Sequence, residues 1–136
     1  MAPCISYFSD ELRALAHASE GALTMEGDGP EDFEAIFYPQ TGALEVIVKA
    51  PTVSIAWEYL FIEDTPVNDR EIADRLLAIC DGILAGTASS HKSGLPICRR
   101  IDTAVALKTR GLDTVWRDRS TVFFDFGHAN QTSRQA

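Results

Sequence analysis

The stretch NDREIADRLLAICDGILAG, residues 68–86, decides the fold class of this chain. Asn68 followed three residues later by Glu71 is a capping box in its Asx form, and Gly86 suits the residue that ends a helix. The apolar residues between them recur at helical spacing and predict one buried stripe: Ile72, Leu76, Leu77, Ile79, Cys80 and Ile83. The stretch therefore predicts an amphipathic helix with a core-facing side.

Extended segments precede this helix and are separated by turns that contain Pro and Gly. Residues 33–38 are rich in aromatic and apolar side chains, and residues 53–62 form a longer run that places Trp57 and Phe61 on the same face. The strand expected at 44–49 alternates, and its two faces carry different side chains: Leu44, Val46 and Val48 on one, Glu45, Ile47 and Lys49 on the other. The short connections predict an antiparallel meander of these three strands.

The flanking segments complete the order of elements. Residues 6–20 have a helical repeat of apolar side chains, whereas the acidic residues 26–34 and the polar residues 87–95 are expected to be loops. Two strand regions follow the second helix: residues 96–107, and residues 112–117 with 120–126, either as one bent strand or as two short ones. The order α-β-β-β-α-β-β predicts an α+β fold, a single antiparallel sheet of about five or six strands with two helices packed on one face.

The length of the chain suits one domain, which we expect at residues 1–126, followed by a frayed polar tail at residues 127–136. No apolar run approaches the roughly 20 residues of a membrane-spanning helix. The N-terminus also lacks the basic and apolar regions of a secretion signal. We therefore expect a cytoplasmic protein whose three cysteines are reduced: Cys4, Cys80 and Cys98.

Motifs for metal, nucleotide or nucleophilic chemistry are not assembled in the sequence. The three histidines are scattered and no C-x-x-C or H-x-x-x-H pair occurs, so no metal site is expected. Residues 86–93 approach the phosphate-binding loop pattern, but His91 replaces its second glycine and the loop follows a helix instead of a strand. No cofactor is expected, and a binding protein is favoured over an enzyme.

Charge is divided unevenly along the chain. Residues 1–91 hold sixteen Asp and Glu against four Lys and Arg, a balance of −12, whereas residues 92–136 have a balance of +4, so that the net charge is −8. This acidity opposes binding to nucleic acid or to an anionic membrane and suits a basic protein partner. The expected contact surface comprises seven acids and one aromatic anchor: Glu26, Asp28, Glu31, Asp32, Glu58, Glu63 and Asp64, with Trp116.

In size, charge and architecture the chain resembles bacterial immunity proteins, which neutralise a cognate toxin by covering its site. That resemblance implies a non-enzymatic inhibitor of a basic, nuclease-like toxin; many such proteins act as monomers, which favours a monomer here without fixing the oligomeric state. The order of elements is also similar to that of the acidic chaperones of type III secretion, which are dimers and end in a further helix where this chain has strand and polar tail. A third hypothesis is a small enzyme whose site joins the distant residues Glu58, His91 and Asp125.

Overall fold

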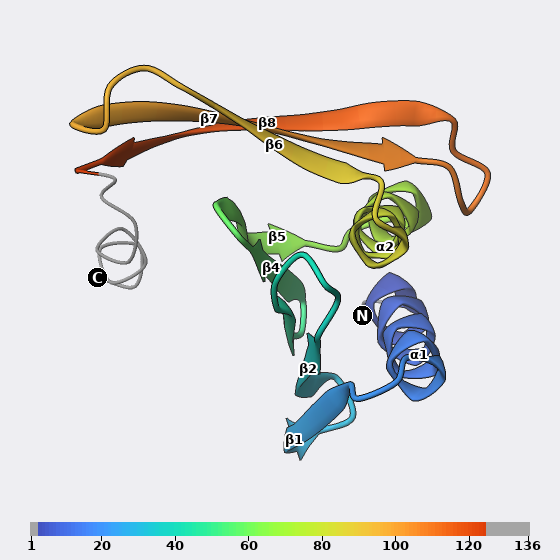
Figure 1. The fold of residues 1–136 in the computed structure, drawn as a ribbon. Helices are drawn as coiled ribbons and strands as arrows, with labels where there is room; N and C mark the ends of the chain where they lie inside the picture. The colour runs from blue at the N-terminus through green and yellow to red at the C-terminus, as the bar shows by residue number, and fades with distance from the viewer. Residues whose placement is uncertain (1–2, 125–136) are drawn as a thin grey trace.

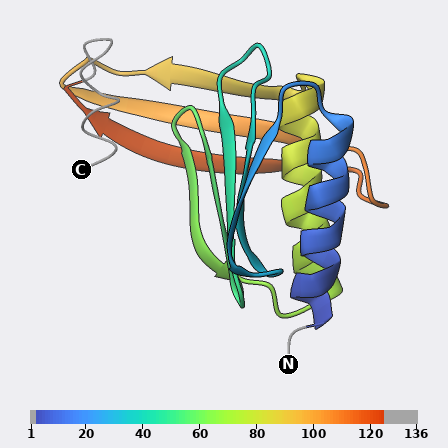
Figure 2. The ribbon, with the colours of Figure 1, turned by 90° about the horizontal axis from the view of Figure 1, so that it is seen from below.

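The computed structural model describes residues 3–124, which form two helices and eight strands (Figures 1 and 2). Their order and bounds are α1 (Pro3–Ala18), β1 (Leu23–Gly29), β2 (Asp32–Phe37), β3 (Leu44–Lys49), β4 (Thr52–Trp57), β5 (Leu60–Pro66), α2 (Arg70–Ala85), β6 (Ala88–Ser93), β7 (Cys98–Leu107) and β8 (Thr114–Phe123). Strands β1 to β5 form an antiparallel meander, sheet A, and β6 to β8 form a separate antiparallel sheet, sheet B. The predicted α+β class is confirmed. Neither helix in these residues is long and apolar enough to span a membrane.

The prediction of a single sheet of five or six strands is wrong, because the strands before α2 and those after it pair only among themselves. There are also more strands than predicted, since two segments expected to be loops contain strands. Strand β1 covers part of the acidic segment 26–34, and β6 covers most of the polar segment 87–95. Each pairs through its backbone with a neighbour that has a buried face, β1 with β2 and β6 with β7. Backbone hydrogen bonds of an antiparallel ladder form whatever the polarity of the side chains, so composition did not reveal these strands.

The run 53–62 is two strands rather than one. The chain turns at Glu58, which has a φ of 51°, so that β4 and β5 form a hairpin. Phe61 pairs with Ala56 and therefore lies on the face opposite Trp57, contrary to the prediction. The C-terminal region is one strand, β8, and the expected tail at 127–136 lies outside the described residues.

Helix α2 has the predicted buried stripe and a shifted N-terminus. Its cap is Asp69 rather than Asn68, and the Asp69 carboxylate accepts a hydrogen bond from the Ile72 N–H at 2.9 Å. Gly86 ends the helix in the left-handed conformation, at a φ of 81°, as its position predicts. The other helix, α1, spans residues 3–18 instead of 6–20.

One hydrophobic core joins both helices to the two sheets. Helices α1 and α2 lie on the same side of sheet A (Figure 2), and α2 also packs against β7 of sheet B. The second contact is close at Gly82, where a Cβ atom would lie 2.5 Å from Val105 Cγ1. Arg110, in the β7–β8 turn, ties this corner together, because its guanidinium binds Asp81 of α2 at 2.9 Å and Glu11 of α1 at 2.7 Å.

Sheet B extends past sheet A on the side away from the helices (Figure 1). The β4–β5 turn supports it there: Lys92 Nζ donates to the Tyr59 hydroxyl at 3.1 Å, and Ser120 Oγ donates to the Tyr59 carbonyl at 3.5 Å. Both helices thus lie on one side of sheet A, and no helix among residues 3–124 lies on its other face.

Candidate functional site

The face of sheet A that points away from both helices, here called the outer face, carries the candidate site. The strand register and alternation place these side chains on it: Leu23, Met25, Asp32, Glu34, Ile36, Glu45, Ile47, Lys49, Thr52, Ser54, Ala56, Phe61, Glu63 and Asp64. Four large apolar residues of this face keep a substantial exposed fraction, namely Leu23 with 54%, Met25 with 50%, Phe61 with 40% and Ile47 with 38%. A solvated sheet face is normally polar, so this gathering of apolar side chains makes the outer face a candidate contact surface.

Carboxylates surround these apolar side chains. The charged residues of the outer face are five acids and one base: Asp32, Glu34, Glu45, Glu63 and Asp64, with Lys49. A cluster of one sign of charge attracts oppositely charged partners and speeds their association. The outer face is therefore suited to a surface that is both basic and apolar.

Glu34 and Glu45 are neighbours on this face. In the register Glu34 is opposite Ile47 and Glu45 is opposite Ile36, so the two carboxylates are diagonal neighbours on adjacent strands. Partial burial of Glu34, followed by repulsion from Glu45 and a hydrogen bond with it, raises the pKa of Glu34 above its ordinary value. A cation placed between the two carboxylates would relieve that repulsion.

A hollow of about 310 Å³ adjoins this pair over β3, β4 and β5. Glu45, Ile47 and Phe61 line it, and so does Ser54, whose hydroxyl accepts a hydrogen bond from the Asp64 N–H at 2.9 Å. The hollow is open to solvent. Its shape suits an inserted side chain of a protein partner better than an enclosed small molecule.

The predicted contact residues do not form one cluster. Asp32, Glu63 and Asp64 belong to the outer face. Glu26 instead points toward α1, where Arg13 binds its carboxylate at 2.5 Å and 2.8 Å. The hydrogen bond from Arg13 lowers the pKa of Glu26. That carboxylate is held within the molecule by an ion pair on the helix side.

Two further predicted acids lie in and beside the β1–β2 turn. The Asp28 N–H donates to the Asp32 carboxylate at 3.2 Å, and the Glu31 carboxylate accepts a hydrogen bond from the Ser6 hydroxyl of α1. Together with Lys49 they border an open hollow of about 470 Å³ at this end of sheet A. The turn therefore extends the acidic surface beyond the outer face.

Glu58 and Trp116 lie apart from the other predicted contact residues. Glu58 is in the β4–β5 turn at the opposite end of sheet A, where its Oε1 would be 2.6 Å from a Cβ at Gly42. Trp116 is half-buried on the face of sheet B that packs against the core. The fold brings neither of them beside the acids of the outer face.

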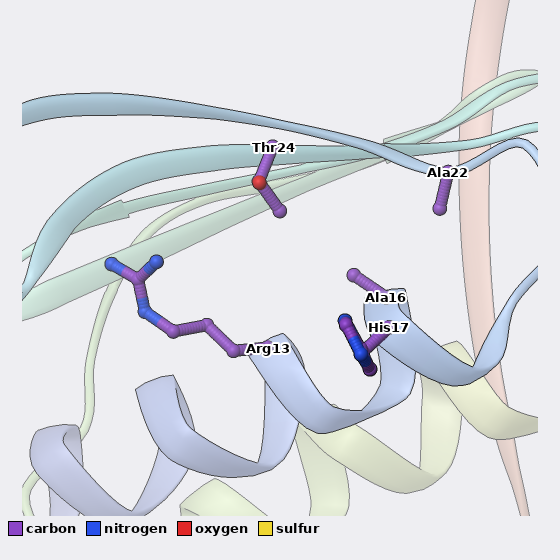
Figure 3. Close-up of a pocket in the computed structure, with 5 residues that line it drawn as sticks. All are labelled: Arg13, Ala16, His17, Ala22 and Thr24. Carbon is purple, nitrogen blue, oxygen red and sulfur yellow. The ribbon is translucent and has the colours of Figure 1, made fainter.

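A pocket of about 260 Å³ lies between α1 and the start of β1 (Figure 3). Five residues line it: Arg13, Ala16, His17, Ala22 and Thr24. The Arg13 guanidinium already binds Glu26 and stacks on the Phe33 ring, 3.8 Å from its centroid. A cation that is engaged in this way does not offer a ready site for an anionic ligand.

Sheet B carries a basic outer face, on the side away from α2. Its ionisable side chains are four basic groups around one acid: His91, Arg100, Arg117 and Arg119, around Asp102. Arg119 binds Asp102 at 2.8 Å, and this hydrogen bond lowers the pKa of Asp102. A hollow of about 550 Å³ lies here, but a carboxylate lines it and disfavours a bound anion.

Two residues of the enzyme hypothesis, Glu58 and His91, are not brought together. Lys92, on the face of sheet B that packs against the core, donates a hydrogen bond to Tyr59, the neighbour of Glu58 in the chain. His91 precedes Lys92 in β6, so strand alternation puts its side chain on the opposite face of sheet B. Asp125 lies outside the described residues. Among the residues that the structure does describe, no three His, Cys, Asp or Glu side chains are grouped so as to hold a metal ion.

The cysteines do not supply a nucleophile at the outer face. Burial raises the pKa of the Cys80 thiol to about 12, so this thiol stays protonated within the α2 stripe. Cys98 is exposed on sheet B, and Cys4 is half-buried in α1. None of the three lies on sheet A.

Comparison with protein-family models, with curated proteins and with solved structures finds no match. What the outer face can bind is therefore inferred from its own chemistry. Sequence reasoning did not single out Met25, Glu34, Glu45 or Ile47 as contact residues. The alternation at 44–49 did place Glu45 and Ile47 on one face. Met25 precedes the segment 26–34 that composition assigned to a loop, and Glu34 lies where that segment overlaps the strand expected at 33–38.

Proposed function

We propose that this chain is a non-enzymatic protein-binding protein that neutralises a basic, nuclease-like bacterial toxin by covering its active site with an acidic surface. The observation that carries the proposal is the outer face of sheet A, where exposed apolar side chains lie among carboxylates and neither of the two described helices covers them. Apolar contacts supply the affinity of a protein interface, and complementary charge supplies fast association and discrimination between partners.

The separation of charge within the fold supports this reading. Five acids lie on the outer face of sheet A and two more, Asp28 and Glu31, at the β1–β2 turn, whereas the basic residues of the C-terminal third lie largely on sheet B. A molecule with this charge distribution orients a basic partner toward sheet A before contact. The same polarity opposes the approach of nucleic acid to that surface.

The two alternatives receive less support. The chaperone hypothesis rests on an order with three strands between the helices, and this fold has five there and three after the second helix. The enzyme hypothesis needs Glu58 and His91 together, but the residue of β6 that reaches Tyr59, next to Glu58, is Lys92, which points to the face of sheet B opposite His91.

The test begins with capture of partners from a lysate of the native cell at low salt and again at high salt, with identification by mass. The captured basic protein is then purified, and its catalytic activity is titrated with this chain. We expect stoichiometric inhibition, with an association rate that falls as salt rises.

Charge reversal assigns the inhibition to the acidic surface. Asp32→Lys with Glu63→Lys should slow association, whereas Asp10→Lys with Glu20→Lys, the same change in net charge on the helix side, should leave the rate nearly unchanged. The proposal would be overturned by a partner that binds without losing its activity. It would also be overturned by an association rate that changes neither with salt nor with the first pair of substitutions.

A further inference from the structure

The outer face has a centre where charge and apolar surface meet. Glu34 and Glu45 are diagonal neighbours there, and the exposed apolar residues Met25 and Ile47 flank Glu34 in register on either side. Among the described residues, no Lys or Arg forms an ion pair with Glu34 or Glu45. The centre therefore presents two adjacent acceptors beside apolar surface, with the open hollow next to them.

We propose that this centre binds a basic amphipathic helix of the partner protein, with one Lys or Arg side chain between the Glu34 and Glu45 carboxylates and an apolar side chain in the hollow beside Ile47. The inference rests on the proposed function and deepens it, because it names the element of the partner and the residues that hold it.

A helix is the element that fits this surface. The opposite face of the same sheet is covered by two helices, and a broad twisted antiparallel face packs against helices in general. A partner strand would add to an edge of sheet A and would leave the outer face uncovered. The side chains of a helix at three- and four-residue spacing offer the mixed basic and apolar stripe that the centre requires.

Other occupants conflict with the charge of the face. If a second copy docked through the same face, the five acids of one copy would lie against the five acids of the other, and the two sets of like charges would repel each other. Nucleic acid and anionic lipid surfaces are repelled for the same reason. A basic protein segment satisfies both the carboxylates and the apolar surface.

The proposal carries a proton-linked signature. Partial burial and Glu45 raise the pKa of Glu34, and a bound cation lowers that pKa again, so binding at a pH near it releases a proton. The groups that face Glu34 are Met25 from β1, Asp32 and Ile36 from β2, and Ile47, Glu45 and Lys49 from β3. Affinity should therefore fall as the pH drops through the titration of Glu34.

The probe is a synthetic peptide about 18 residues long, in which leucines recur at helical spacing and lysines fill the flanking positions, long enough to form a helix when bound. A peptide of the same composition with the spacing scrambled serves as the comparison. Binding is measured by fluorescence anisotropy, and the site is mapped by changes in backbone amide NMR shifts. We expect the helical peptide to shift amides of Met25, Glu34, Glu45 and Ile47 and the scrambled peptide to bind more weakly.

Two matched pairs of variants test the named residues. The double variant Glu34→Gln with Glu45→Gln should lower the affinity for the peptide about tenfold and abolish the pH dependence of binding. The double variant Asp10→Asn with Glu20→Gln, which changes the net charge by the same amount, should alter the affinity by less than about twofold. Ile47→Thr should weaken binding, and Val115→Thr, at an exposed apolar position of sheet B, should not.

The outcomes separate this inference from the proposed function. Equal weakening by the two charge-removing pairs, or NMR changes confined to the β1–β2 turn, would overturn the assignment to Glu34 and Glu45 while an acidic binding surface survives. A protein that binds neither the peptide nor any basic partner at low salt would overturn both. Self-association that buries the outer face, detected by sedimentation, would overturn the choice of occupant.

Discussion

Replacement of Gly82 by alanine tests how sheet B is held on helix α2, and the packing around this residue gives the sign of the effect. At an exposed site within a helix, Gly→Ala stabilises by about 1 kcal/mol, because alanine restricts the unfolded chain and favours the helix. Here the added Cβ would lie 2.5 Å from Val105 Cγ1 and 3.0 Å from the Ala106 carbonyl oxygen. Overpacking of this kind costs about 2–3 kcal/mol, since the backbone of β7 must move.

The net expectation for Gly82→Ala is a loss of about 1–2 kcal/mol in the free energy of unfolding, or a fall of about 3–6 °C in Tm for a chain of this size. Urea unfolding, followed by circular dichroism and by tryptophan fluorescence, measures it. The matched experiment repeats the substitution in a Val105→Ala background. The closest atom is gone there and the contacts at 3.0 Å with the Ala106 carbonyl oxygen and Thr87 Oγ1 remain, so Gly82→Ala should cost clearly less than in the parent protein.

A double-mutant cycle then isolates the contact between the two positions. The coupling between Gly82→Ala and Val105→Ala should be about 1–2 kcal/mol. A stabilising Gly82→Ala in the otherwise unchanged protein, or a coupling of zero, would refute the close packing of α2 against β7.

Three other predictions follow from the same structure. Arg110→Met should lower the free energy of unfolding by about 2–4 kcal/mol, because it leaves the largely buried carboxylate of Asp81 without its ion pair; urea unfolding measures the loss, and a stability equal to that of the parent would contradict it. Glu34→Gln should raise stability at neutral pH. The folded-state pKa of Glu34 lies above its unfolded value, so the penalty for its charge is absent below the unfolded pKa and complete once the pH has risen through the folded pKa. Thermal melts at pH 3 and pH 7 should therefore show no gain at the lower pH, and a gain that persists there would rule out titration of Glu34 as the cause. With a disulfide reagent at neutral pH, Cys98 should react in the native protein and Cys80 only after unfolding, because burial raises the pKa of the Cys80 thiol to about 12; modification of native Cys80 at the rate of Cys98 would show that α2 opens readily.

The candidate site was predictable only in part. Asp32, Glu63 and Asp64 were expected as contact residues because they are acidic, and they do belong to the outer face. Acidity alone did not distinguish them from Glu26, which the fold turns toward Arg13 of α1. The difference lies in which side of sheet A each strand position faces, and that depends on the pairing of β1 with β2.

The amino-acid sequence by itself determined the elements with strong periodicity. Gly86 and the apolar stripe predicted helix α2, and alternation predicted β3, because burial on one side imposes a period on the local sequence. The α+β class and the excess of acids followed from the same information.

Only the tertiary structure decided how the strands divide into two sheets and which face of sheet A remains uncovered. Strands β1 and β6 exist through backbone pairing with a neighbour, which side-chain composition does not encode. The turn at Glu58 needs a left-handed residue that is not glycine, and it moves Phe61 onto the outer face. Alternation defines two faces of a strand, but only the packing of both helices on one side of sheet A decides that the face of Glu34 and Ile47 is the one without a helix from residues 3–124.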